Sequence, residues 1–133
     1  MGAVEDYIEY YGSHQWEQLR GVFDAGDFTR VGPYLDLFTD VGAYVDFLEQ
    51  VVPTMGAEYE LRVERIIYAA DGNVVVAQLI EHLELDGEMT DIPETIVFDL
   101  NDEGLIRRMS LYLKQPGALA PVGGKNAMGA VEG

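Results

Sequence analysis

The sequence predicts an α+β fold in which N-terminal helices pack on a curved, mostly antiparallel sheet and form a conical cavity. Two observations carry this prediction. Up to Pro53, apolar residues recur with the spacing of amphipathic helices. From Tyr59 to Lys114 they alternate with polar residues over four long segments that are separated by turn signals. Helices followed by a meander of strands are typical of α+β proteins.

Three helices are expected before the sheet. The first covers residues 3–11, where apolar side chains recur at i, i+3, i+4 and i+7. The second covers residues 14–23, with an apolar face of its own. The third covers residues 41–52, because Asp40 can cap its first turn and Pro53 cannot continue it.

A short extended segment separates the second and third helices. Residues 28–31 are expected to form a strand that ends at the backbone break Gly32-Pro33. Residues 34–38 are expected to be irregular or extended. This strand would carry Arg30 into the cavity.

The four long strands are joined by turns at Asp71-Gly72, at Asp86-Gly87 and at residues 101–104. Asp-Gly between alternating hydrophobic residues is a strong hairpin signal, because glycine tolerates a positive φ. Successive side chains point to opposite faces of a strand, so one face collects most of the large apolar residues. That face has four polar exceptions, which are Glu81, Glu94, Arg65 and Arg107.

The turn lengths predict how the strands pair. A two-residue turn in the second hairpin places Leu79 opposite Glu94, and a four-residue last turn places Phe98 opposite Arg107. Glu94 then lies diagonal to Glu81, and diagonal neighbours are roughly 7–8 Å apart, within reach of long side chains. The sequence therefore predicts a carboxylate pair inside an apolar cup.

The opposite face of the sheet is too apolar for contact with water alone. It is expected to carry Val76, Ile80, Ile106 and Tyr112. Exposed apolar patches of this kind usually mark an interface. We therefore expect a homodimer that packs through this outer face.

Composition excludes several classes of function. The 133 residues include 24 acidic and 8 basic side chains, for a net charge of −16, and such a surface repels nucleic acids and anionic membranes. There is no cysteine, and two histidines make a transition-metal site improbable. We therefore expect no metal, no cofactor, no nucleic-acid partner and no membrane partner. No run approaches the roughly 18 apolar residues of a membrane span, so we expect a cytoplasmic protein.

The chain divides into two parts by composition. Residues 1–115 are expected to form a single cone-shaped α+β domain. Residues 116–133 form a tail rich in Gly, Pro and Ala, with few large apolar side chains.

Several motifs carry a resemblance to a known family. They are Trp16-x-x-Leu19, Asp27-Phe28-x-Arg30-x-Gly32-Pro33, Tyr44-x-x-Phe47-Leu48 and the closing strand at residues 104–112. In these motifs and in the order of its elements, the chain resembles the nuclear transport factor 2-like (NTF2-like) superfamily over roughly residues 3–114. This superfamily includes ketosteroid isomerase, limonene epoxide hydrolase, scytalone dehydratase and SnoaL-like polyketide cyclases. The resemblance implies a conical, mostly apolar cavity for a small organic ligand.

The catalytic positions of these relatives match only in part. The catalytic tyrosine of ketosteroid isomerase falls on Tyr7, but its base falls on Gly32 and its proton donor on Ile96. One catalytic aspartate of limonene epoxide hydrolase falls on Glu81, while its arginine and second aspartate fall on Leu79 and Leu111. The matching positions therefore do not contain the complete set of catalytic residues of either enzyme.

Glu81 is therefore the first catalytic candidate, because burial raises the pKa of a carboxyl group and makes it useful for acid/base catalysis. The alternative is a structural ion pair with Arg30, Arg65 or Arg107. Glu94 could share a proton with Glu81, or could lie solvated near the rim. Arg30 could bind an oxyanion, or could form a structural salt bridge.

The remaining candidates line the expected cavity. Tyr7 and Asp36 could add a hydroxyl donor and a further acid, although ordinary packing or surface exposure is the alternative for both. The walls that contact a ligand are expected to include Tyr34, Leu79, Phe98, Met109 and Leu111.

Three functions remain open from sequence alone. The first is a cofactor-independent enzyme with carboxylate acid/base chemistry on a small hydrophobic molecule, of the isomerase, cyclase, dehydratase or epoxide hydrolase type. The second is non-catalytic binding of a small apolar ligand. The third is a dimeric structural or interaction module with a vestigial pocket.

Overall fold

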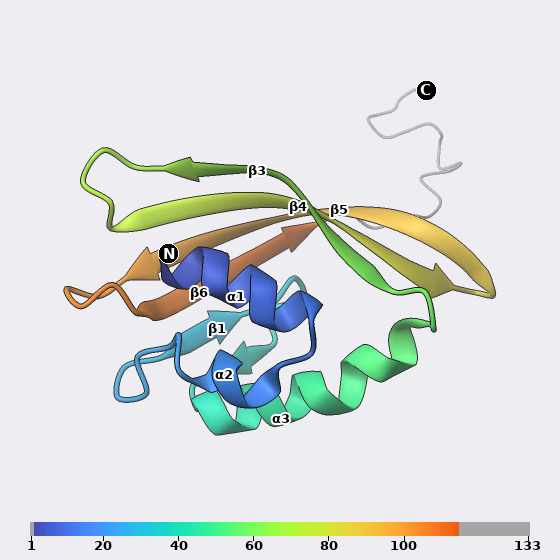
Figure 1. Cartoon of the computed structure of the whole chain (residues 1–133), viewed down its shortest axis with the longest axis horizontal. Coiled ribbons are helices and arrows are strands. Elements are labelled where there is room, and N and C mark those ends of the chain that lie inside the picture. The colour runs from blue at the N-terminus through green and yellow to red at the C-terminus, as the bar shows by residue number, and fades with distance from the viewer. Residues whose placement is uncertain (1, 115–133) are drawn as a thin grey trace.

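The computed structural model describes residues 2–114 and shows the expected order of helices and strands (Figure 1). The N-terminal part contains α1 (Ala3–Gly12), α2 (Trp16–Arg20), β1 (Thr29–Val31), β2 (Leu37–Phe38), α3 (Val41–Val51) and the 3-10 helix η1 (Val52–Met55). The long strands follow as β3 (Glu60–Tyr68), β4 (Val74–Leu85), β5 (Glu88–Leu100) and β6 (Ile106–Leu113). The expected tail at residues 116–133 lies outside the described residues.

The helices begin and end for local reasons. Asp40 caps α3 as expected, because its side chain accepts a hydrogen bond from Ala43 N at 2.8 Å. The second helix is shorter than its pattern predicted and begins only at Trp16. Before it, His14 has a positive φ of 60° and stacks on the Trp16 ring, with the two ring centroids 5.4 Å apart.

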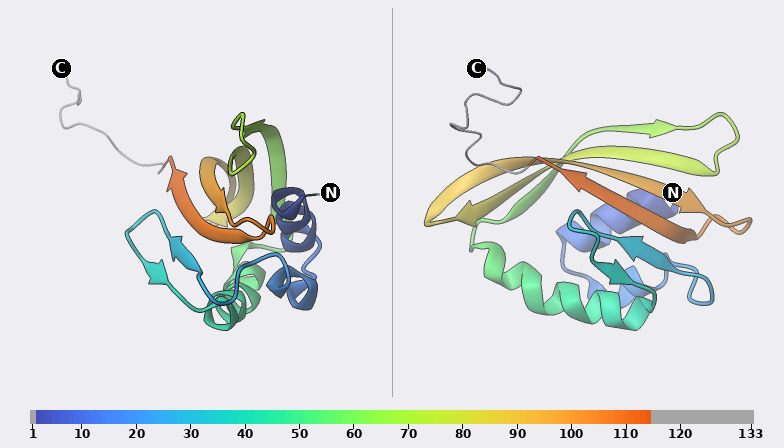
Figure 2. Two further views of the ribbon diagram at one scale, coloured as in Figure 1. Left: turned by 90° about the vertical axis from the view of Figure 1, so that its left-hand side faces the viewer. Right: turned by 180° about the vertical axis from the view of Figure 1, so that it is seen from behind.

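Within residues 2–114, one curled sheet holds all six strands, in the order β2-β1-β6-β5-β4-β3. Only β1 and β6 run parallel, and the other neighbours are antiparallel. The helices lie on the concave side of this sheet (Figure 2). The α+β cone that the sequence predicted is therefore confirmed.

The β4–β5 hairpin has the predicted register. Asp86 and Gly87 both have positive φ, at 52° and 83°, and Leu85 pairs with Glu88 across this two-residue turn. Further along, Leu79 pairs with Glu94. The hairpin therefore directs Glu81 and Glu94 to the same inner face.

The predicted register of β5 with β6 is wrong. Phe98 pairs with Met109 rather than with Arg107, and Glu94 pairs with Leu113 rather than with Leu111. Part of the difference comes from the turn, where the Asn101 side-chain oxygen accepts from Glu103 N at 2.8 Å and from Leu105 N at 2.9 Å. An irregularity in the β5–β6 hydrogen-bond ladder next to Leu100 accounts for the rest of the difference in register.

Two β-bulges turn the expected inward arginines outward. In β3 the register shifts between Val63 and Arg65, so Arg65 is exposed and pairs with Gln78. At the start of β6 the irregularity leaves Arg107 exposed, 3.4 Å from Asp27. Ile106, which was expected on the outer face, is fully buried instead.

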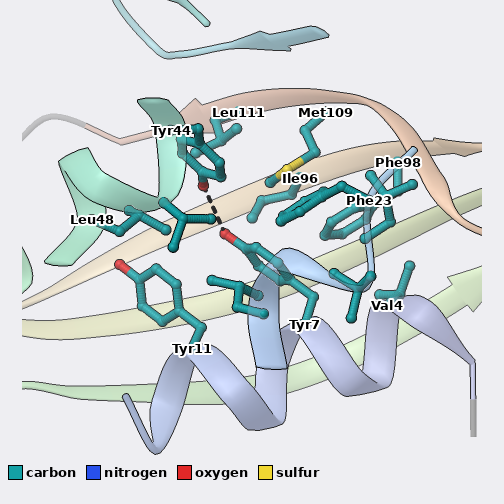
Figure 3. Close-up of a cluster of buried hydrophobic side chains, with 14 of the residues drawn as sticks. Val4, Tyr7, Tyr11, Phe23, Tyr44, Leu48, Ile96, Phe98, Met109 and Leu111 are labelled. Carbon is teal, nitrogen blue, oxygen red and sulfur yellow. Dashed lines mark hydrogen bonds between the residues drawn. The ribbon is translucent and has the colours of Figure 1, made fainter. Parts of the chain in front are cut away.

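The core lies between the helices and the inner face of the sheet (Figure 3). Phe98 and Met109, which were expected to contact a ligand, are fully buried within it. Phe98 meets the edge of the Tyr7 ring, with centroids 5.6 Å apart. Burial of such aromatic and aliphatic side chains is the main favourable term for folding.

The outer face of the sheet exposes several large apolar side chains. Tyr112 is 61% exposed and Ile67 is 46% exposed. The same face carries a polar group in which Asp91 Oδ1 lies 2.7 Å from His82 Nδ1 and accepts from Arg62 Nη2 at 2.8 Å. The homodimer expected through this face stays a prediction. Among the described residues, no helix has both the length and the apolar character to cross a membrane.

Candidate functional site

A cavity of about 280 Å³ opens between the inner face of the sheet, α1 and α3. Its walls are mostly apolar. All five residues expected to be catalytic line it, namely Glu81, Glu94, Arg30, Tyr7 and Asp36. Three of the five expected ligand contacts, Tyr34, Leu79 and Leu111, also line it, whereas Phe98 and Met109 lie in the core.

The two carboxyl groups meet in this cavity. Glu81 and Glu94 come from adjacent strands and are 9% and 5% exposed. A hydrogen bond joins them, and it can form only while at least one carboxyl carries a proton. The predicted carboxylate pair is therefore present.

Glu94 is the carboxyl group that resists ionisation. Burial is the largest cause that raises its pKa well above the ordinary value, and the hydrogen bond and the charge of Glu81 raise it further. The positive charge of Arg30 acts in the opposite direction but does not outweigh these effects. Glu94 thus holds its proton at pH values where an ordinary glutamate has lost it.

None of the arginines proposed as partners forms an ion pair with Glu81 within residues 2–114. Arg65 and Arg107 point away from the cavity, and Arg30 pairs with Asp36. Instead, Tyr59 Oη lies 3.2 Å from Glu81 Oε1. The structural ion pair that was the alternative for Glu81 is therefore wrong.

Arg30 is buried at the other end of the cavity and forms an ion pair with Asp36, whose side chain is partly exposed. Its Nη1 donates to Asp36 Oδ2 at 2.6 Å, and its guanidinium lies 5.2 Å from the Tyr44 ring centroid and 5.7 Å from that of Phe38. Asp36 also accepts from Tyr34 N at 3.1 Å. Although burial opposes it, the hydrogen bonds from Arg30 and from backbone amides lower the pKa of Asp36.

The lack of a side chain at Gly32 leaves space for the ion pair between Arg30 and Asp36. A Cβ atom at this position would collide with both carboxylate oxygens of Asp36 and with Arg30 Nη1. The resemblance to ketosteroid isomerase places a catalytic base at Gly32, where this chain has no side chain. The Asp36 carboxylate occupies the space beside it.

Three tyrosines that sequence reasoning left out of the site add hydroxyl groups to it. Tyr44 Oη lies 3.1 Å from Tyr7 Oη (Figure 3). Tyr59 Oη lies 3.0 Å from Tyr11 Oη. Burial raises the pKa of all four hydroxyls, so they stay protonated and act as hydrogen-bond donors. In the sequence, Tyr11 and Tyr44 stand at positions where an aliphatic residue would complete the apolar face of a helix, and Tyr59 stands directly before a strand. This choice of tyrosine was the only local signal for their role in the site.

Residues 2–114 contain no group of three or more His, Asp or Glu side chains that could hold a metal ion.

Comparisons with known proteins identify the fold. No family model and no curated protein matches the sequence. Among solved structures, a putative SnoaL-like polyketide cyclase from Jannaschia sp. CCS1 matches with a TM-score of 0.71 and 19% identity, over 84% of this chain and 82% of that one. A putative ketosteroid isomerase from Kribbella flavida matches with a TM-score of 0.71 and 17% identity, over 87% and 78% of the two chains. A limonene epoxide hydrolase-like (LEH-like) epoxide hydrolase from M. tuberculosis matches with a TM-score of 0.68 and 18% identity, over 84% and 80%.

These likenesses confirm the predicted fold. At such low identities they show the fold alone, and the NTF2-like proteins that share it differ in the reactions their names describe. The function of this chain must therefore be argued from its own cavity.

Proposed function

We propose that this chain, which has the NTF2-like fold, is a cofactor-independent enzyme that transfers protons on a small hydrophobic molecule. One observation carries the proposal. Two buried carboxyl groups share a hydrogen bond in a mostly apolar cavity, and one of them has a strongly raised pKa. A pair of titratable groups whose environments differ in this way is the usual arrangement for acid/base catalysis.

The charges of the cavity favour an uncharged substrate. Arg30 is paired with Asp36, and Glu94 shares its proton with Glu81, so the carboxyl pair carries the negative charge that no arginine compensates. A carboxylate on the ligand would be repelled by Glu81 at close range in a site of low dielectric constant. The volume of about 280 Å³ suits a compact molecule at the small end of known ligand sites.

The chemistry needs an oxygen atom on this substrate. A carboxyl group that is protonated near neutrality can donate to a carbonyl, hydroxyl or epoxide oxygen, while a neighbouring carboxylate takes a proton from carbon or from water. Tyr7 and Arg30 lie on the cavity wall, where they can stabilise negative charge that develops on that oxygen. Isomerisation, cyclisation, dehydration and epoxide opening all use these steps.

A second candidate function is non-catalytic binding of the same class of molecule. This function is favoured by the absence of two catalytic groups. The resemblance to ketosteroid isomerase places its base on Gly32 and its proton donor on Ile96, and neither residue can transfer a proton. The two functions differ in whether a bound molecule is converted.

A panel of small ketones, epoxides and alcohols, each matched with a carboxylic acid of the same skeleton, separates these functions. We expect at least one neutral compound to bind and to be converted, as measured by calorimetry and by mass spectrometry of the products. Its carboxylate analogue should bind on the order of 10- to 100-fold more weakly, because of repulsion by Glu81. Binding without conversion would support the second function, and carboxylates that bind as well as neutral compounds would contradict the charge argument.

A further inference from the structure

Tyr59 is fixed against β4 by the turn that precedes β3. Its backbone N donates to Gly56 O at 3.2 Å, and Gly56 has a φ of 109°, which favours glycine. A Cβ atom on Gly56 would lie 3.1 Å from Glu84 Cβ, so the turn packs directly on β4. Leu61, two residues further on, pairs with Glu81 in the sheet. The Tyr59 ring is thereby held beside the Glu81 carboxyl group.

The hydroxyl of Tyr59 has two polar neighbours but only one proton. Its oxygen lies 3.2 Å from Glu81 Oε1 and 3.0 Å from Tyr11 Oη. A carboxylate can only accept, whereas a tyrosine hydroxyl can donate and accept. Both contacts are satisfied when Tyr11 donates to Tyr59 and Tyr59 donates to Glu81.

Glu94 has no such donor among the contacts of the described residues. Its hydrogen-bond partner is Glu81, and its own proton supplies that bond. Glu81 therefore accepts from Tyr59 as well as from Glu94, whereas Glu94 is the donor in the bond between the two carboxyl groups.

We infer that Tyr59 is a positioning residue that assigns the two carboxyl roles, with Glu81 as the proton acceptor and Glu94 as the proton donor. This inference rests on the proposed function and adds the direction of proton transfer. Glu94 gives its proton to the substrate oxygen, and Glu81 takes a proton from the substrate carbon or from water. That proton then passes from Glu81 to Glu94 along the bond between them, which restores the starting pair.

The other titratable groups around the pair leave this assignment in place. They come from α1, β1, the β1–β2 loop and α3, and they are Tyr7, Tyr11, Arg30, Asp36 and Tyr44. The tyrosines stay neutral because burial raises their pKa. Arg30 is paired with Asp36, and its charge lowers the pKa of Glu94 less than burial raises it.

The test compares Tyr59→Phe with wild type and with Tyr10→Phe. Tyr10 lies on α1, is half-buried and does not line the cavity, so its variant removes a hydroxyl without touching the pair. The carboxyl carbons of Glu81 and Glu94 are observed by carbon-detected NMR at pH 7 and assigned with Glu81→Gln and Glu94→Gln. We expect wild type to show one protonated and one ionised carboxyl, and Tyr59→Phe to move both signals towards each other. Tyr10→Phe should leave both signals unchanged.

A second readout applies once a converted compound is known. Tyr59→Phe should lower kcat by about 10-fold with little change in KM, and should move the acidic limb of the pH–activity profile to higher pH. Tyr11→Phe, which removes the donor to Tyr59, should shift the carboxyl signals in the same direction by a smaller amount, and it replaces Tyr59→Phe should that variant fail to fold.

The NMR result separates the two levels of the proposal. Signals that shift as described support the role of Tyr59 even if no compound is converted, in which case only the enzymatic function fails. Carboxyl signals that stay at their wild-type positions in the folded hydroxyl-deletion variants would overturn the inference, whether or not the protein is an enzyme.

Discussion

Glu94→Gln is expected to lower turnover by at least about 100-fold while leaving the cavity intact, because general acid/base groups contribute about 10²–10⁴-fold to rates. The glutamine amide has nearly the same shape and can still donate to Glu81, but it cannot release a proton. Substrate affinity should therefore change little while kcat falls. Glu88→Gln is the matched control, since Glu88 lies on the same strand but is exposed at the hairpin.

The same variant should change how stability depends on pH. The folded-state pKa of Glu94 lies above its unfolded value, so the folded protein binds the extra proton. That contribution to stability is fully present below the ordinary glutamate pKa of about 4.3 and is lost as the pH rises through the folded-state value. Glu94→Gln cannot lose this contribution. The free energy of unfolding of the variant minus that of wild type should therefore be larger at pH 8 than at pH 5.

Urea unfolding of wild type, Glu94→Gln and Glu88→Gln at the two pH values measures this effect. A stability difference between Glu94→Gln and wild type that stays constant from pH 5 to pH 8 would show that Glu94 ionises normally. Turnover of Glu94→Gln within 10-fold of wild type would remove Glu94 from the mechanism.

Asp36→Asn is expected to destabilise the protein by about 2–3 kcal/mol. It removes the charge that compensates Arg30, which is 6% exposed, and an unpaired buried charge costs several kcal/mol. The side chain of Asp36 is 43% exposed, so water can replace part of the lost interaction, and the effect should fall below that of a fully buried pair. Because the pKa of Asp36 is lowered, its contribution is present above the ordinary aspartate range and is lost as the pH falls through the folded-state value.

Asp27→Asn is the matched control for Asp36→Asn. It removes the same charge from the Arg107–Asp27 pair, whose side chains are 43% and 67% exposed, and exposed pairs contribute about 0–1 kcal/mol. Chemical denaturation at pH 7 compares the two variants. Equal effects of the two substitutions would mean that the Arg30 charge is solvated rather than buried and dependent on Asp36.

The sequence located the carboxyl pair because a short turn determines the register of the β4–β5 hairpin. Asp86-Gly87 permits one tight turn, and from this turn the alternation of side chains places Glu81 and Glu94 on the inner face. The helices were found for a similar reason, since their apolar spacing and the Asp40 cap are local signals.

The sequence misplaced Arg65 and Arg107 because a β-bulge leaves no clear local pattern. One extra residue reverses the alternation for the rest of a strand, and this depends on how neighbouring strands fit together. The pairing of Arg30 with Asp36 also depends on the tertiary packing of a loop against β1. Tyr59 could not be identified because its contact with Glu81 is produced by the turn at Gly56.

The most direct test of the central claim is a carbon-detected NMR pH titration of the Glu94 carboxyl group, assigned with Glu94→Gln. We predict that Glu94 titrates well above the ordinary glutamate value of about 4.3, and that the Glu81 signal responds to the same transition because the two groups share a proton. That result would establish a carboxyl pair suited to acid/base chemistry in this cavity. Titration of Glu94 at or below the ordinary value, with no response of Glu81, would contradict the shared proton and with it the proposed enzymatic function.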